Sequence, residues 1–79
     1  MQVRVLLFAG LREAAGREAL ELTLPDGAPV SALRAAVERA APALCGHRYR
    51  VAVGAHYAHE DQAVPAGGEV ALLPPVSGG

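Results

Sequence analysis

Hydrophobic and polar residues alternate in two stretches near the start of the chain, Gln2 to Ala9 and Glu18 to Leu24. Successive side chains of a strand point to opposite faces, so this alternation predicts two strands, each with an apolar face. Gly10 and Gly16 bound the segment between them, where Leu11 to Ala15 predicts one helical turn. We expect the second strand to pair antiparallel with the first.

The pattern then changes to the period of a helix. Apolar residues recur at helical spacing from Val30 to Ala41, which predicts one amphipathic helix that stops at Pro42. Arg50 to Gly54 predicts another short strand, and Glu69 to Leu73 predicts the last one. The intervening segment, Ala55 to Gly68, is polar and turn-rich, and it is too long for a hairpin.

The predicted order of elements is therefore β, β, α, β, β in a chain of 79 residues. These elements pack most economically as a mixed sheet with the helix across one face, which is a two-layer α+β domain. This is the ubiquitin-like β-grasp arrangement, in which the first and last strands are usually central, parallel neighbours. We expect one domain over residues 1–74 and an extended tail over residues 75–79 that leaves from the middle of the sheet.

The composition of the predicted tail suggests delivery of a carboxyl group. Pro74 and Pro75 hold the backbone extended and cannot continue a ladder or a helix. Gly78 and Gly79 have no Cβ, so they can pass through a narrow channel into the active site of another protein. The alternative is a frayed, glycine-rich chain end.

Strand parity predicts an apolar patch near the tail. Val70 and Leu72 share one face of the last strand, so Leu73 points to the other face, where a solvated sheet is normally polar. Phe8 and Leu6 lie on the corresponding face of the first strand. Together with Tyr57 from the long loop, these side chains form an exposed interface patch unless a loop covers them. These candidate patch residues are Leu6, Phe8, Tyr57 and Leu73.

Composition and charge restrict the possible partners. Hydrophobic residues make up 52% of the chain with one Phe, two Tyr and no Trp, so the core must be aliphatic. A domain this small leaves little room for an internal active-site cleft. The net charge is −1, and the seven basic residues, all Arg, are scattered among eight acids rather than gathered into a patch. This distribution argues against nucleic acid as a partner.

Cys45 is the single cysteine, which excludes an internal disulfide and suits a reducing cytosol. We expect it to be a buried or half-buried apolar residue. The sequence shows no signal peptide and no apolar run long enough to cross a bilayer, so we expect a cytoplasmic protein with no membrane partner.

A metal site and a nucleotide site are both disfavoured. The candidate zinc ligands have spacings that fit no standard motif, so no metal is expected. They are Cys45, His47, His56, His59, Glu60 and Asp61. No strand, glycine loop and helix follow one another in the order that a phosphate-binding fingerprint needs, so the chain should not bind ATP by itself.

Three segments resemble the small subunit of molybdopterin synthase, a ubiquitin-like sulfur carrier of molybdenum-cofactor biosynthesis. Val5 to Glu13 is similar to that family's first strand and Leu-Arg-Glu turn, and Val51 to Gly54 to its Ala-Val-Asn strand end. Glu69 to Gly79 carries the most specific likeness, and the resemblance covers essentially the full length. The chain departs from the family at Gly54, where Asn is favoured, and at Gly68, where Asp is usual.

The resemblance implies that Gly79 is the reacting residue, with Gly78 beside it. An E1-like partner enzyme would adenylate its carboxylate with ATP, and a persulfide sulfur donor would displace AMP to leave a thiocarboxylate. The tail would then enter a pocket of the large synthase subunit, in a heterotetramer, and deliver sulfur to cyclic pyranopterin monophosphate (precursor Z). No cofactor is bound in this scheme beyond the covalent acyl-adenylate or thiocarboxylate. The implied partner-binding residues are Phe8, Tyr57, Leu73, Pro74, Pro75, Val76 and Ser77.

The sequence is also compatible with three other functions. A sulfur carrier for thiamine synthesis or tRNA thiolation would share the fold, the diglycine and the activation chemistry. A ubiquitin-like modifier would join Gly79 to lysines of other proteins, although the chain itself has no Lys and cannot accept such a link. A plain binding module would not need Gly78 and Gly79.

Overall fold

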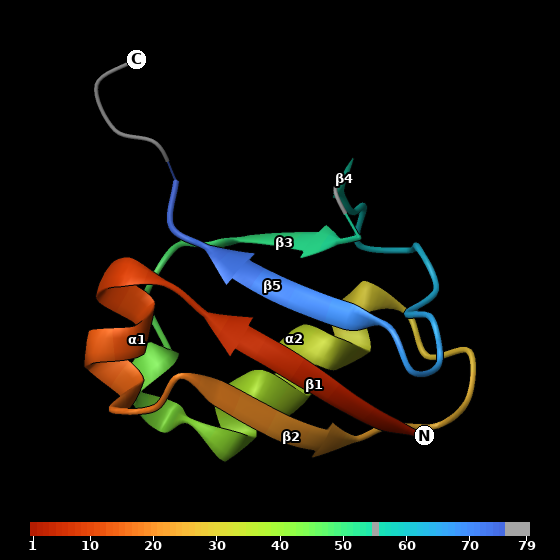
Figure 1. The fold of residues 1–79 in the computed structure, drawn as a ribbon, viewed down its shortest axis with the longest axis horizontal. Helices are drawn as coiled ribbons and strands as arrows, with labels where there is room; N and C mark the ends of the chain where they lie inside the picture. Colours follow the sequence, from red (N-terminus) through yellow and green to blue (C-terminus); the bar gives the residue numbers. More distant parts are fainter. Residues whose placement is uncertain (55, 76–79) are drawn as a thin grey trace.

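The computed structural model describes residues 1–54 and 56–75. Their elements, in chain order, are β1 (Gln2–Leu7), α1 (Ala9–Ala15), β2 (Ala19–Thr23), α2 (Val30–Ala40), the 3-10 helix η1 (Pro42–Leu44), β3 (Arg50–Val53), β4 (His56–Tyr57) and β5 (Glu69–Leu73) (Figure 1). The strands form one mixed sheet, and α2 lies across one of its faces. The predicted α+β class is confirmed.

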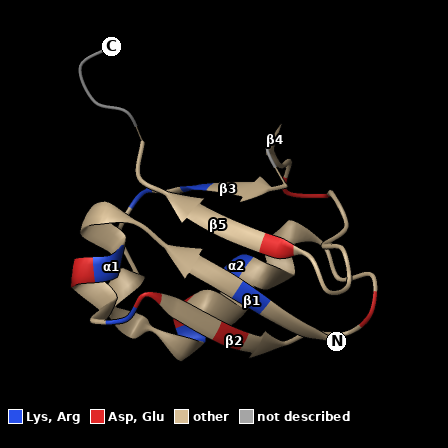
Figure 2. Ribbon diagram, viewed as in Figure 1, with Lys and Arg blue, Asp and Glu red and all other residues tan. Residues whose placement is uncertain are grey.

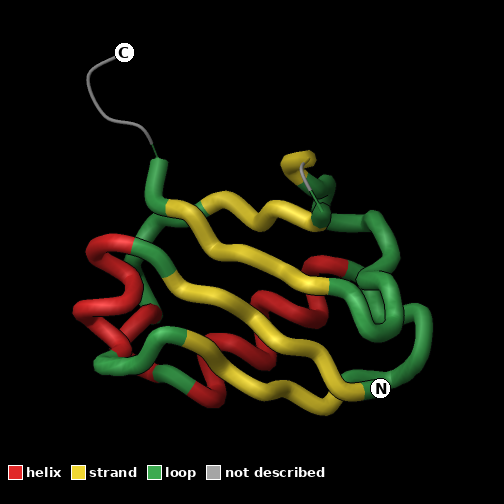
Figure 3. Tube along the Cα trace, in the orientation of Figure 1, coloured by secondary structure: helices red, strands yellow, loops and turns green. Residues whose placement is uncertain are grey.

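The sheet order is β2-β1-β5-β3-β4 (Figure 3). β1 pairs antiparallel with β2 and parallel with β5, as predicted. β5 also pairs antiparallel with β3, so it has a strand on each side. The segment that follows β5 therefore leaves from the middle of the sheet, where hydrogen bonds on both edges hold its base.

The aliphatic core lies between the sheet and α2. Val3, Val5 and Leu7 of β1 are almost completely buried, as are Val70 and Leu72 of β5. From α2 the buried residues are Val30, Leu33, Ala36 and Val37. The alternation in the sequence thus identified the buried faces of the strands, and the helical spacing identified Val30, Leu33 and Val37 of α2; Ala40, expected on the same face, is exposed because the helix ends there.

The loop before β5 supplies the cap that α2 lacks in its own sequence. Pro29 precedes α2 and has no side-chain cap, but the Val30 amide donates to the Gln62 carbonyl at 2.9 Å and the Ser31 amide to the Glu60 carbonyl at 3.0 Å. These bonds satisfy two of the amides that a helix leaves unpaired at its start. The polar segment predicted as a loop is therefore tied to the helix at these points.

Several boundaries differ from the prediction. β1 ends at Leu7, two residues early, because the chain turns into α1 at Ala9, and α1 is longer than the expected single turn. The two-residue strand β4 lies within the predicted loop, since so short a strand leaves no alternation to detect. Cys45 is exposed, so its predicted burial is wrong; it follows η1, where the chain has already left the core.

Candidate functional site

The face of the sheet opposite α2 is divided into a polar half and an apolar half. In the polar half, Arg4 of β1 pairs with Glu21 of β2 at 2.9 Å, and the Gln2 amide nitrogen donates to the Thr23 hydroxyl at 3.0 Å. In the apolar half, strand register aligns one residue from each strand in a row: Ala19, Leu6, Ala71, Ala52 and Tyr57. Figure 2 shows charged residues on β1 and β2 away from the end of β5 that leads to the tail.

Part of this apolar half forms an open cavity of about 330 Å³. Its lining residues are Phe8, Ala52, Gly54, His56, Tyr57, Ala71 and Leu73. Phe8 and Tyr57 are large apolar side chains with 43% and 51% of their surface exposed. We call this hollow the apolar cavity. Large exposed aromatic side chains around small floor residues are typical of a protein-binding surface.

Each aromatic residue is positioned by a different local feature. Phe8 has extended backbone angles at the junction of β1 and α1, and its carbonyl accepts the Leu11 amide at 3.1 Å. Tyr57 lies opposite Ala52 in the register of β4 and β3. The guanidinium carbon of Arg50 stacks 3.8 Å from the centroid of the Tyr57 ring. Backbone geometry thus positions Phe8, while register and a stacking partner position the ring of Tyr57.

The structure brings Phe8, Tyr57 and Leu73 together, as strand parity predicted. Leu6 is only partly exposed and lies beside this cavity rather than in its lining. Sequence reasoning missed the floor, Ala52 and Ala71, because alanine carries little hydrophobic signal. Ala71 lies on the same face of β5 as Leu73, and Ala52 lies opposite Ala71 in register. Both alanines could therefore have been identified once the pairing of β3 with β5 was known.

The tail begins at the end of β5. Pro74 is partly buried and Pro75 is exposed. The remaining predicted tail residues, Val76, Ser77, Gly78 and Gly79, lie outside the described residues, so their roles stay predictions. The apolar cavity lies beside the tail's base, because Leu73 belongs to its lining.

The two departures from the resembled family have local explanations. Gly54 has a φ of 63°, a left-handed conformation that Gly and Asn both tolerate better than other residues. A Cβ at Gly68 would lie 2.8 Å from Cγ of Pro65, so glycine avoids a steric conflict at the position where the family usually has Asp.

Other kinds of site receive no support from the part of the chain that is described. Within residues 1–54 and 56–75, no group of three His, Cys, Asp or Glu side chains is arranged to hold a metal ion. None of the described helices has the length and apolar character needed to cross a membrane.

Residues 5–79 match the model of the ThiS family. A molybdopterin synthase sulfur carrier subunit of Chlamydomonas reinhardtii is 39% identical over the full length of both chains. SAMP1 of Haloferax volcanii, a small archaeal modifier protein, has a similar structure with a TM-score of 0.89, 31% identity and full coverage of both chains.

A second similar structure comes from Helicobacter pylori, in a complex of subunits 1 and 2 of molybdopterin-converting factor. The matched chain has a TM-score of 0.68 and 25% identity, with both chains fully covered. The family match extends over nearly the whole sequence, and the likeness to these structures confirms the predicted β-grasp fold. The chain belongs to the ThiS family.

Proposed function

We propose that this chain is the sulfur carrier subunit of a molybdopterin synthase. The observation that carries the proposal is the apolar cavity of Phe8, Tyr57 and Leu73 beside the central strand that leads into the diglycine tail. A carrier needs such a pair of features, a docking surface and a reactive end on a firm base. The 39% identity over the full length of a molybdopterin synthase sulfur carrier subunit supports the choice of pathway.

The proposed chemistry uses the carboxylate of Gly79. A carboxylate is a poor electrophile, so an adenylating enzyme first joins it to AMP and releases pyrophosphate from ATP. A persulfide sulfur then attacks the acyl carbon, AMP leaves, and reduction of the resulting acyl disulfide by a thiol leaves a thiocarboxylate. The thiocarboxylate sulfur is a far better nucleophile than the original oxygen, and it attacks cyclic pyranopterin monophosphate. Hydrolysis of the acyl-sulfur bond leaves sulfur on the product and returns Gly79 to a carboxylate.

The folded domain supplies recognition in this scheme. Phe8 and Tyr57 would contact the large synthase subunit, while Pro74 and Pro75 keep the start of the tail extended. The acid, base and oxyanion groups belong to the partner, so the carrier acts as a cosubstrate more than as a catalyst. The proposed partners are the large subunit, in a heterotetramer, the adenylating enzyme and a sulfur donor, all in the cytoplasm.

A second candidate function is protein modification. The likeness to the archaeal modifier favours it, because that protein shares the fold over its full length. In this role an acceptor lysine would attack the activated Gly79 and form an amide. A carrier for thiamine synthesis or tRNA thiolation would use the same thiocarboxylate with another acceptor.

The proposal is tested by measuring the intact mass of the untagged protein purified from its native host. A thiocarboxylate adds about 16 Da, because one sulfur replaces one oxygen, and the addition disappears on hydrolysis. Fragmentation assigns the change to Gly79 and separates it from oxidation of Met1 or Cys45. The matched control is a chain without Gly79, which should never gain this mass.

Adding the large subunit and cyclic pyranopterin monophosphate then identifies the acceptor. Loss of the added mass together with dithiolene formation is the expected result. A protein that stays a carboxylate with the adenylating enzyme, ATP and a persulfide donor present contradicts the carrier function. Conjugates to lysines of other proteins in the native cell would favour the modifier instead.

A further inference from the structure

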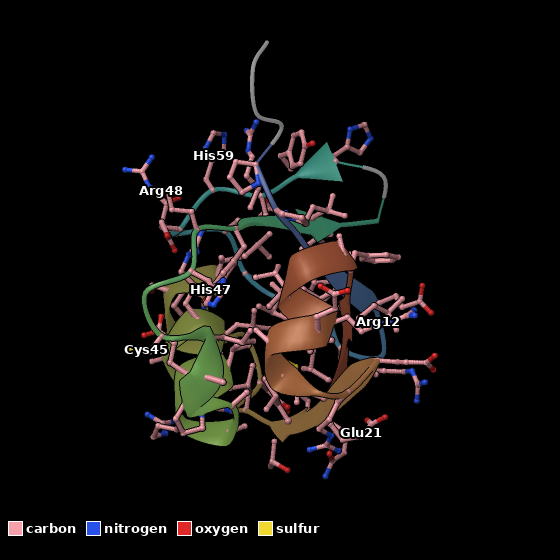
Figure 4. The ribbon with its side chains drawn as sticks, turned by 90° about the vertical axis from the view of Figure 1, so that its left-hand side faces the viewer. Arg12, Glu21, Cys45, His47, Arg48 and His59 are labelled. Carbon is pink, nitrogen blue, oxygen red and sulfur yellow. The ribbon has the colours of Figure 1, made fainter. Side chains whose placement is uncertain are left out.

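A second hollow of about 490 Å³ also borders the base of the tail. Its lining residues are Arg34, His47, Arg48, Tyr49, Arg50, Glu60 and Pro75. We call this hollow the basic cavity. Pro75, the last described residue, belongs to its lining, so the tail departs at its edge. Figure 4 shows Arg48 near the end of the molecule from which the tail leaves.

The basic cavity corrects an expectation from the sequence. The seven arginines look scattered along the chain, but the fold brings Arg34 of α2 next to Arg48 and Arg50 at the start of β3. Among the arginine and glutamate side chains of the lining, three guanidinium groups and one carboxylate leave an excess of two positive charges. This local excess stands out in a chain whose net charge is −1.

The cavity already binds one carboxylate of the chain itself. Glu60 lies 2.5 Å from Nε of Arg34, and 58% of the Glu60 side-chain surface is exposed. Arg34 is further occupied by the Tyr49 ring, whose centroid lies 4.8 Å from its guanidinium carbon. Arg34 is therefore a structural part of the wall rather than a group available to a ligand.

Arg48 and Arg50 remain to face a partner. Both are exposed, and neither makes a salt bridge with another described residue. Arg50 also stacks on Tyr57, which belongs to the apolar cavity, so one side chain joins the two hollows. A protein that takes up the tail and covers the apolar cavity must approach both arginines.

We propose that the basic cavity is an electrostatic docking site for carboxylate side chains on the large synthase subunit, beside the pocket that takes up the tail. This inference rests on the proposed function and adds the chemistry of the partner's surface. Solvent-exposed opposite charges speed association and orient the encounter, while the apolar contact sets most of the lifetime of the complex. Such a division suits a carrier that must bind, unload and leave for recharging.

The test measures association of the purified carrier with the large subunit of the same organism at several salt concentrations. Arg48→Glu should slow association about 10-fold at low ionic strength, and the difference should shrink to about 2-fold or less near 0.5 M salt. Arg48→Lys keeps the charge and should associate like the wild type. The matched control is Arg17→Glu, which reverses an exposed arginine just before β2, a strand that β1 separates from β5, and which lines neither cavity.

Three results for the variants would overturn the inference alone. Wild-type rates for Arg48→Glu with an unchanged salt dependence would show that the basic cavity takes no part in docking. A loss that persists at high salt would point to altered structure, and an equal loss for Arg17→Glu to net charge alone. Failure of the wild-type carrier to bind the large subunit would overturn the proposed function as well, which separates the two failures.

Discussion

The guanidinium carbon of Arg50 lies 3.8 Å from the centroid of the Tyr57 ring, and this stack joins the basic cavity to the apolar cavity. It also connects β3 to the edge strand β4, which has only two residue pairs in register with β3. A strand this short gains little from its own hydrogen bonds. The stack therefore helps to hold the Tyr57 ring in the lining of the apolar cavity.

Arg50→Ala should increase local opening of β4 while the rest of the sheet stays intact. An exposed cation–π contact contributes about 0.5–1 kcal/mol, so exchange of the Ala58 amide, which donates to Val51 at 2.8 Å, should accelerate about 2- to 5-fold. Native-state hydrogen exchange measures this, with Arg48→Ala as the matched control. Unchanged Ala58 exchange would show that the stack does not restrain β4.

Leu72→Ala and Leu73→Ala should separate stability from docking within one strand. Leu72 is fully buried in the core, so its truncation should lower the free energy of unfolding by about 2–4 kcal/mol. Leu73 lines the apolar cavity on the open face, and its truncation should cost about 1 kcal/mol or less but weaken binding to the large subunit. Denaturant titration and a binding assay measure the two effects. Equal loss of stability in both variants would contradict the assignment of Leu73 to the open face.

Tyr49→Phe should remove part of the stability that the wild-type protein loses at alkaline pH. Burial raises the pKa of the Tyr49 hydroxyl above its ordinary value of 10.0, although the nearby Arg34 opposes this shift. Above pH 10 the unfolded chain loses this proton while the folded protein retains it, so the free energy of unfolding falls as pH rises through the folded pKa. The stabilising effect is complete below pH 10.

The Tyr49 hydroxyl is buried and has no hydrogen-bond partner among the described residues. Replacement by Phe should therefore change stability at neutral pH by about 1 kcal/mol or less, in either direction. Denaturant unfolding between pH 7 and 11 tests both expectations, with Tyr57→Phe as the control for loss of an exposed hydroxyl. If the free energy of unfolding of Tyr49→Phe falls at alkaline pH as much as that of the wild type, groups other than Tyr49 cause the fall.

Gly68→Ala should destabilise the turn before β5 through contact with Pro65. The added Cβ would lie 2.8 Å from Cγ of Pro65, which is too close for either group to keep its position. Such overpacking costs about 1–3 kcal/mol. In a Pro65→Ala background the cost of the same substitution should fall to about half or less. An equal cost in both backgrounds would show that the backbone of Gly68, not the proline ring, sets the requirement.

The local pattern of hydrophobic and polar residues was sufficient to predict most of the fold. Alternation identified β1, β2 and β5 and the faces they bury, because side chains of a strand point alternately to opposite sides. The same parity separated Leu72 from Leu73 and assigned Phe8 and Leu73 to an exposed apolar patch. The diglycine and the segments resembling a sulfur carrier indicated the proposed function.

Other features depend on residues that are distant in the sequence. The floor of Ala52 and Ala71 exists because β3 and β5 pair in one register, and no local signal marks an alanine as part of a site. The capping of α2 by Glu60 and Gln62 likewise joins a loop to a helix about thirty residues earlier.

The clearest contrast is between hydrophobic pattern and charge. A buried face follows from the spacing of apolar residues within one element, so the sequence by itself determined the strands, the helix and the core. A charged surface follows from which elements meet, and only the tertiary structure brought Arg34 of α2 beside Arg48 and Arg50. Electrostatic interaction depends on distance in space, and the chain's order does not reveal that distance until the sheet and helix have packed.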